Sequence, residues 1–372
     1  MSFVRFYPKR IYIERSMRDH PTVETVLNNR PQAEAIYVDD PDTIRINTPS
    51  GVNPITYRKK LLLLRRQKGS FFKKCPGIHD TICCNYYILN WANDCHLDCS
   101  YCFLQSYLNH SVAKIYVNTE DMLTELDHVF KKNPRSNYRV GTGEYADSLG
   151  WDDMTHLSDT LVPFFAHYPN ALLELKTKSD QIDRLIRLNS VGNTVVSWSV
   201  NPPKIIREEE HKTASLAHRL RAARRCAEKG YKIAFHFDPM IHYLEWETGY
   251  KSVVDQIFDT IPIRQIAWIS IGAFRFHPLL KEIVRTRFPK SKIFLGEFIP
   301  ADHDKMRYFK PIRVQMYQKI RQWIADRDPN IFNHLCMETE DVWQKIYGFS
   351  PGCSADLNRM FDNRGILFTQ NS

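Results

Sequence analysis

Short runs of β-branched and aromatic residues alternate with longer amphipathic runs from about residue 86 onward. This alternation is typical of repeated βα units, in which each strand is followed by a helix that packs on the sheet. The expected strands cover residues 86–91, 138–141, 172–177, 194–200, 232–238 and 265–271. Six units within about 190 residues predict an α/β fold whose parallel sheet curls into an incomplete (β/α)6 TIM-type barrel, rather than an open doubly wound sheet. In either arrangement, functional residues are expected at the carboxyl ends of the strands.

The clearest expected helix covers residues 214–229. Its apolar residues recur at helical spacing, at Leu216, Leu220, Ala223 and Ala227. This stripe is expected to pack inward, with the arginines of the helix mostly off it. Thr213 is the expected N-cap and Gly230 the expected stop. A second helix is expected near residues 311–327.

The chain divides into three expected parts. Residues 1–84 have no sustained periodicity, contain turn-forming residues and carry a basic run, so we expect an N-terminal basic extension packed on the barrel. Residues 85–297 form the expected barrel, and residues 298–372 form a C-terminal extension. The pattern indicates no role for residues 328–372.

The composition is that of a globular protein, with 43% hydrophobic residues among 372. The N-terminal residues lack the apolar core of a secretory signal, and nowhere do about 18 apolar residues run together. We therefore expect a soluble, cytoplasmic protein with no membrane contact. In that compartment nine cysteines are expected to be thiols or metal ligands rather than disulfides.

The net charge of +9 is concentrated in two places. Eight basic residues and no acidic residue lie between residues 58 and 74: Arg58, Lys59, Lys60, Arg65, Arg66, Lys68, Lys73 and Lys74. A second cluster lies on the expected helix at Arg219, Arg221, Arg224 and Arg225. Such patches suit a polyanion such as nucleic acid, but a solvated basic face is the alternative, and charge alone leaves both open.

A loop of three cysteines follows the first expected strand directly. Cys95, Cys99 and Cys102 have the spacing Cys-x3-Cys-x2-Cys. Three thiolates on so short a loop can bind three irons of a [4Fe-4S] cluster, which leaves the fourth iron without a protein ligand. That iron can be chelated by the amino and carboxylate groups of S-adenosyl-L-methionine (SAM), whose sulfonium then accepts an electron and breaks to give a 5′-deoxyadenosyl radical. The spacing therefore predicts a radical SAM enzyme.

Structural zinc is the alternative, with His96 or His110 as the fourth ligand. Zinc sites more often use paired knuckles on separate hairpins, whereas these three ligands share one loop, which favours the cluster. We expect Cys83 and Cys84 to be core or strand residues and Cys226 to be a small apolar residue of the helix. The cysteines without comparable spacing are Cys75, Cys83, Cys84, Cys226, Cys336 and Cys353.

An ordered set of motifs between residues 57 and 319 resembles the spore photoproduct lyase family, which consists of radical SAM enzymes of DNA repair. In addition to the cysteine loop, the matching motifs are Tyr57-Arg58-Lys59, Phe103-Leu104-Gln105, Tyr116-Val117-Asn118, Thr177-Lys178, Ser199-Val200-Asn201, Glu228-Lys229-Gly230-Tyr231, Trp246-Glu247-Thr248-Gly249-Tyr250 and Tyr317-Gln318-Lys319.

The resemblance implies that the barrel binds SAM across its strand ends and takes a flipped-out thymine dimer from damaged DNA. It implies that Lys178, Ser199 and Asn201 contact SAM, and that the turn at residues 141–144 places Glu144 near the SAM amino group, where the carboxylate can accept from the ammonium. The alternatives are a simple surface pair between Lys178 and Glu144, and a capping role for Ser199 and Asn201. DNA and an electron donor such as a flavodoxin or ferredoxin are the implied partners.

The chain departs from the family at the hydrogen-return path. In the family, a cysteine shortly after the second strand returns a hydrogen atom to the thymine radical, and two tyrosines relay it. Here Glu144 and Tyr145 occupy the region of that cysteine, Tyr101 matches one tyrosine and Phe103 replaces the other. Tyr101 and Tyr145 are the expected catalytic residues, and Cys336 is a further candidate that no spacing distinguishes.

Three hypotheses follow. The first is a lyase that reverses a thymine photolesion in DNA. The second keeps the SAM radical chemistry but acts on another nucleotide or on RNA, which the missing cysteine favours. The third, motivated by charge and cysteines alone, is a zinc-stabilised nucleic-acid-binding protein without catalytic activity.

Overall fold

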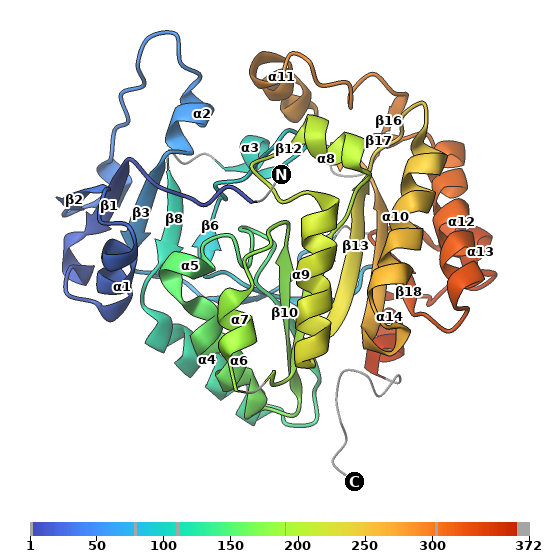
Figure 1. Ribbon diagram of the computed structural model, residues 1–372, viewed down its shortest axis with the longest axis horizontal. Helices are drawn as coiled ribbons and strands as arrows, with labels where there is room; N and C mark the ends of the chain where they lie inside the picture. Colours follow the sequence, from blue (N-terminus) through green and yellow to red (C-terminus); the bar gives the residue numbers. More distant parts are fainter. Residues whose placement is uncertain (1–2, 78–79, 109–111, 190, 302–303, 363–372) are drawn as a thin grey trace.

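The main sheet of the computed structural model has eight strands in the order β18-β14-β13-β11-β10-β9-β5-β4 (Figure 1). The structure describes residues 3–77, 80–108, 112–189, 191–301 and 304–362. Neighbouring strands pair in parallel except β4 and β5. The edge strands β18 and β4 are not paired with each other, so the curled sheet is an incomplete barrel.

All six expected strands are confirmed. They are β5 (Tyr87–Leu89), β9 (Tyr138–Gly141), β10 (Ala171–Thr177), β11 (Thr194–Ser199), β13 (Lys232–Met240) and β14 (Ile266–Ala273). The sheet also contains β18 (Asn333–Leu335) and the antiparallel β4 (Phe72–Lys74), which the sequence pattern did not predict. Both are only three residues long, too short for a recognisable periodicity.

A second sheet occupies much of the N-terminal region, where no regular structure was expected. Its order is β2-β1-β3-β8-β6, and it lies beside the barrel at the left of Figure 1. The strands are β1 (Arg10–Glu14), β2 (Glu34–Val38), β3 (Leu61–Arg65), β8 (Ala113–Tyr116) and β6 (Ala92–Asn93). Every residue of β3 is buried, so its sequence is a continuous apolar run without the alternation of a half-buried strand.

The boundary expected at residue 84 does not separate the two sheets, because strands on each side of it join the other sheet. Strand β4 comes from the N-terminal region and joins the barrel, whereas β6 and β8 follow β5 in the sequence and join the N-terminal sheet. Smaller strands form a two-stranded pair, β7 (Asp98–Cys99) with β12 (Glu210–His211), and a three-stranded sheet of β15 (Arg275–Phe276), β17 (Met306–Tyr308) and β16 (Phe298–Pro300).

Helices flank the sheets (Figure 1). Those of the N-terminal half are α1 (Pro21–Asn29), α2 (Pro54–Arg58), α3 (Leu104–Tyr107), α4 (Thr119–Lys132), α5 (Asp152–Thr155), α6 (Leu157–Ala166) and α7 (Asp183–Arg187). Those of the C-terminal half are α8 (Pro203–Glu209), α9 (Leu216–Lys229), α10 (Trp246–Thr260), α11 (Pro278–Arg287), α12 (Lys310–Arg327), α13 (Glu340–Tyr347) and α14 (Ser354–Asp362). Within the described part of the chain, no helix has the length and apolar character needed to cross a membrane.

Helix α9 matches its prediction except at two residues. Its expected apolar stripe is buried, and Gly230 ends the helix in the left-handed region at φ 108°. The N-cap is Ser215, so the prediction of Thr213 was wrong; the Thr213 hydroxyl instead donates to the Glu210 carbonyl oxygen. Arg219 was expected in an exposed basic cluster, but it is fully buried. Helix α12 confirms the second expected helix.

The buried carboxyl group of Asp152 is hydrogen-bonded to Ser158 of α6 and makes the free energy of unfolding depend on pH. Asp152 is buried, and its two oxygens accept from the backbone N–H and the hydroxyl of Ser158 at 2.8 and 2.5 Å. Burial raises the pKa of Asp152 to about 6, although the two bonds from Ser158 oppose that shift. The native chain therefore binds more protons here than the unfolded chain between about pH 4 and pH 6, and stability falls as the pH rises through this window.

Replacing Asp152 with Asn removes the charge and keeps an acceptor for the Ser158 N–H. We expect the free energy of unfolding of D152N, relative to the unmodified protein, to rise by roughly 2 to 3 kcal/mol between about pH 4 and pH 7. Urea unfolding at the two pH values measures this difference. A difference that does not change with pH would contradict the prediction.

Candidate cluster and cofactor site

The three cysteines of the predicted cluster lie on one loop after β5, at the carboxyl end of the first parallel strand. Cys95 and Cys99 are buried and Cys102 is half-buried. The Cys102 backbone N–H donates to the Cys99 carbonyl at 3.1 Å, and β7, which contains Cys99, pairs with β12. Burial raises the pKa of all three thiols, and each negative charge would disfavour the others. A positively charged partner is therefore needed to hold three thiolates here.

Lys59 lies beside this loop although it belongs to the basic run. Its ammonium donates to the Cys95 carbonyl at 2.6 Å and to the Asp94 carboxylate at 3.2 Å, and the side chain is 3% exposed. Burial alone would lower its pKa, but Asp94 and the thiols of Cys102 and Cys95 outweigh that effect and raise it. Lys59 is thus a permanent cation at the cysteine loop and not a surface contact for nucleic acid.

Other residues of the basic run are also engaged within the protein. Arg65 is buried and donates to both oxygens of Asp42, and Arg66 pairs with Asp121 at 2.5 Å. On α9, Arg219 is buried against Glu210, and Arg224 pairs with Glu228 at 2.9 Å. Neither basic cluster is therefore a fully solvated face, because each contains a buried arginine that is paired within the protein. The exposed members of the run are Lys60, Arg66, Lys68, Lys73 and Lys74.

The donor set of the loop fits an iron–sulfur cluster better than a single ion. Among the described residues, no group of three or more His, Cys, Asp or Glu side chains converges on one ion position. A closed zinc site requires such convergence, whereas each thiolate of a four-iron cube binds a separate iron. His96 is surrounded instead by the rings of Phe3, Phe6 and Trp151, at centroid distances of 5.2 to 5.7 Å. His110 lies outside the described residues.

The carboxylate of Glu210 connects the cysteine loop to the predicted SAM residues. Its Oε1 accepts from the Tyr101 hydroxyl at 2.5 Å and from the Asn201 amide at 2.9 Å, and its Oε2 pairs with the Arg219 guanidinium at 2.5 Å. Arg219 also donates to the Ser199 carbonyl at 2.9 Å. The Tyr250 hydroxyl donates to the other end of the Asn201 amide at 2.7 Å. The structure thus brings Tyr101, Ser199 and Asn201 into one buried network.

The sequence pattern assigned no role in the site to Glu210, Arg219 or Tyr250. Arg219 is buried because it pairs with Glu210 of β12. The spacing of residues along a helix cannot predict a partner that lies on another element. Burial and the neighbouring Glu210 carboxylate hold the pKa of Tyr101 well above its usual range. The Tyr101 hydroxyl therefore keeps its proton and directs it at Glu210.

Glu144 and Lys178 do not pair with each other in the described structure, so a simple surface pair is ruled out. Glu144 accepts from the Tyr86 hydroxyl at 2.7 Å. The Lys178 backbone N–H donates to Asp147 at 2.7 Å, and its ammonium lies 5.8 Å from the centroid of the Tyr101 ring. Tyr145 is half-buried, and burial and Glu144 raise its pKa.

The turn after β9 needs glycine at residue 143. A Cβ there would lie 2.8 Å from the Lys176 Cβ and 2.9 Å from the Lys176 carbonyl oxygen, which real side chains do not tolerate. Asp147 ties the same turn to the end of β10, because it accepts from the Thr177 hydroxyl at 2.6 Å and from the Lys178 N–H. This close approach places the Glu144 loop beside the residues that follow β10.

One face of the barrel sheet carries polar residues that the sequence pattern did not identify. Glu174 accepts from the Ser197 hydroxyl at 2.8 Å and lies 2.6 Å from His236 Nε2, so residues of three adjacent strands meet on this face. Burial would raise the pKa of Glu174, but His236, Lys176 and Arg139 lower it to about 2. Glu174 is therefore a permanent anion within the sheet.

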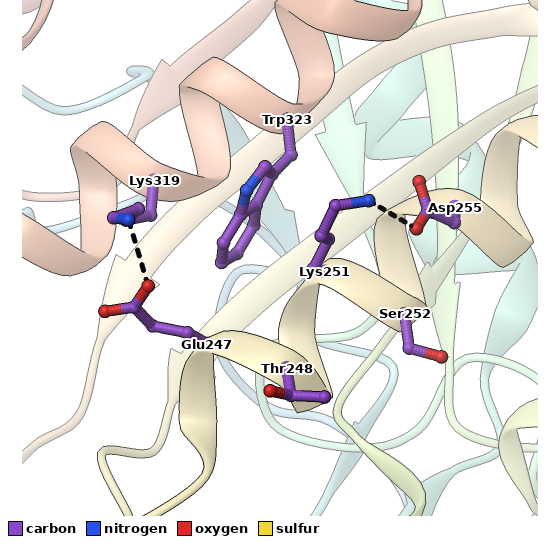
Figure 2. A pocket seen from close by; sticks show the side chains of 7 residues that line it. All are labelled: Glu247, Thr248, Lys251, Ser252, Asp255, Lys319 and Trp323. Atoms are coloured by element: carbon purple, nitrogen blue, oxygen red, sulfur yellow. Dashed lines mark hydrogen bonds and ion pairs between the residues drawn. The ribbon is translucent and has the colours of Figure 1, made fainter.

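A pocket of about 440 Å³ lies elsewhere, between α10 and α12 (Figure 2). Its lining residues are Glu247, Thr248, Lys251, Ser252, Asp255, Lys319 and Trp323. The charges in it are paired, Lys319 with Glu247 at 3.0 Å and Lys251 with Asp255 at 2.8 Å. None of the predicted site residues lines this pocket.

Known proteins share sequence similarity and the fold with this chain. A family model described as "Spore photoproduct lyase" matches residues 6–332. Curated proteins of that name from Bacillus subtilis (strain 168) and Clostridium acetobutylicum are 27% identical over 225 residues and 25% identical over 226 residues. Each match covers 60% of this chain, and 64% and 65% of the respective relative. The match thus spans just under two thirds of their length.

Solved structures of spore photoproduct lyase have the same fold at 21% sequence identity. A mutant superposes with a TM-score of 0.80, and the lyase complexed with dinucleoside spore photoproduct with 0.79; both cover 89% of this chain and 100% of that chain. Another mutant structure contains AdoMet and dinucleoside spore photoproduct.

This incomplete parallel barrel, with its three-cysteine loop after the first parallel strand, has the same fold as the solved structures of spore photoproduct lyase. Since its family model matches most of the sequence, the chain belongs to the spore photoproduct lyase family.

Glu210 should dominate the stability of this region. In Glu210→Gln the fully buried guanidinium of Arg219 loses its anionic partner, which we expect to reduce the free energy of unfolding by about 3 to 5 kcal/mol in urea. The matched control is Glu208→Gln, which breaks an exposed pair with Lys204 and should cost less than about 1 kcal/mol. Equal losses in the two variants would show that the buried pair has no special role.

Proposed function

We propose that the chain is a radical SAM lyase that reverses a thymine photolesion in DNA. The observation that carries the proposal is the position of Cys95, Cys99 and Cys102 on one loop, linked through Tyr101 and Glu210 to Asn201. When bound, the [4Fe-4S] cluster and SAM would supply a 5′-deoxyadenosyl radical that abstracts hydrogen from the lesion. The chain's own residues hold these groups, orient them and limit their access to water.

The proposed cluster ligands are Cys95, Cys99 and Cys102, with Lys59 as the buried cation that offsets their charge. Glu144, Lys178, Ser199 and Asn201 would contact SAM, since all four follow or end strands β9, β10 and β11. The anion of Glu144 suits an ammonium group, and the cation of Lys178 suits a carboxylate. Tyr101 would orient the site through Glu210, and Tyr145 would lie at its edge beside Glu144.

DNA is the proposed partner, supported by the relatives' printed substrate and by the exposed lysines of the basic run. Extraction of a base requires contacts to the phosphates around it. The reducing electron would come from a flavodoxin or ferredoxin in the cytoplasm, where free thiols persist.

A second candidate function is the same SAM chemistry on another nucleotide or on RNA. Phe103 supports it, because its ring is 40% exposed and cannot donate a hydrogen atom where the family has a tyrosine. Glu144 supports it also, since this carboxylate stands where the family has its donor cysteine.

The cluster assignment is tested by anaerobic reconstitution with iron and sulfide. Variants C95A, C99A and C102A should each lose nearly all cluster absorbance and 5′-deoxyadenosine formation from SAM under reduction. The control is Cys353→Ala, because Cys353 is exposed and its thiol donates to the nearby Asp356 carboxylate, away from the cysteine loop. A colourless unmodified protein containing one zinc would overturn the proposal.

The substrate is tested separately with ultraviolet-irradiated DNA that contains spore photoproduct. We expect thymines to be restored in step with the formation of 5′-deoxyadenosine. If SAM is cleaved but the thymines are not restored, while an RNA or free nucleotide stimulates cleavage, the second candidate replaces the first.

A further inference from the structure

Four cysteines outside the cluster loop gather where the chain bridges the two edges of the barrel. The backbone N–H of Ile82 donates to the Glu338 carbonyl at 2.8 Å, so the segment before β5 pairs with the segment after β18. The neighbouring Cys75 thiol raises the pKa of Cys83, and the Cys84 thiol also lies close enough to affect it. Cys336 lies close enough to interact electrostatically with Cys83 and Cys84. More than 250 residues of sequence separate Cys336 from Cys83.

Cys336 occupies the carboxyl end of a parallel strand, where barrels of this kind place their chemistry. It follows β18 directly, and its backbone N–H donates to the Ile271 carbonyl at 2.8 Å. Arg275 donates to its sulfur at 3.5 Å and also pairs with Asp238 at 3.6 Å. Gly272 lets Asp238 and Cys336 pack close to the backbone of β14, since a Cβ there would lie 2.7 Å from an Asp238 oxygen and 3.3 Å from the Cys336 Cβ.

A buried lysine links Cys336 to the proposed SAM residues. Lys176 interacts electrostatically with Glu144, Glu174, Asp238 and Cys336. Lys305 likewise interacts with both Glu144 and Cys336. Cys336 and Glu144 therefore lie near the same two lysines, although they are far apart in the sequence.

Three of the other thiols are less suited to reach a substrate at the strand ends. Cys226 is fully buried in helix α9, and Cys353 is exposed beside α14. Cys83 is buried. Cys336 is partly accessible. Burial and Asp238 hold its pKa well above the usual range, so it is a thiol and not a thiolate at neutral pH.

We propose that Cys336 is the hydrogen-atom donor that completes the reaction. This inference rests on the proposed function, because it requires a carbon radical on the product. The Cys336 S–H bond breaks homolytically, and a C–H bond forms on the product carbon. The sulfur radical left behind returns to the thiol by taking one electron from the low-potential reductant that also serves the cluster, and one proton from water.

The test uses the full-length, reconstituted protein in heavy water with DNA that contains spore photoproduct. The exchanged thiol carries deuterium, so the unmodified protein should place deuterium in the restored thymine. In C336A and C336S, deuterium transfer and thymine restoration should fall roughly tenfold or more, while the 5′-deoxyadenosine formed per cluster remains. Retained cluster absorbance shows that the variants are folded. C353A is the control and should match the unmodified protein.

The outcomes separate the two proposals. If the unmodified protein restores no thymine, the proposed function fails. If it restores thymine and both Cys336 variants still transfer deuterium at the unmodified rate, Cys336 is not the donor. If the loss appears in C84A, Y101F or Y145F and not in C336A, the donor is that other residue and the assignment to Cys336 is overturned.

Discussion

The buried carboxylate of Glu210 is the interaction on which the proposed site depends. An unpaired charge in this position would be very costly, so Glu210 must keep the guanidinium of Arg219, and that requirement fixes helix α9 against β12. The same carboxylate accepts from Tyr101 on the cysteine loop and from Asn201 at the end of β11. Movement of any one of these elements would leave a buried donor or acceptor without a partner. The relative positions of the cysteine loop and the proposed SAM residues are therefore fixed, because breaking this hydrogen-bond network would cost free energy.

The repeating part of the fold could be predicted from sequence because its strands are bounded by turns and separated by amphipathic helices. Each of the six expected strands lies within a few residues of the observed one. The N-terminal sheet could not be predicted in this way. Strand β3 is a buried run of leucines, β2 is mostly exposed or half-buried, and β6 has two residues, so none of the three has the alternation that indicates a strand.

The candidate site was predictable only where its residues are close in sequence. The spacing of Cys95, Cys99 and Cys102 indicates their shared chemistry because one loop carries all three. The role of Arg219 depends on Glu210, which lies on another element. From the sequence alone, Arg219 was grouped with the basic residues of the helix surface. The gathering of Cys336 with Cys83 and Cys84 depends on how β18 meets the segment before β5. No local sequence pattern predicts this contact between segments that are far apart in the chain.

The polar face of the barrel sheet separates this protein from barrels that are filled by branched apolar side chains. The Glu174 carboxylate lies beside His236, which is two strands away in the barrel sheet, and Asp238 of β13 pairs with Arg275 of β15 in the small three-stranded sheet. Such pairs contribute little net stability compared with apolar packing, because desolvation offsets much of their attraction. Their retention is better explained by function, since fixed charges in a site of restricted water access orient a polar substrate without rearranging. Cys336 lies beside this charged group, because Arg275 donates to its sulfur and pairs with Asp238.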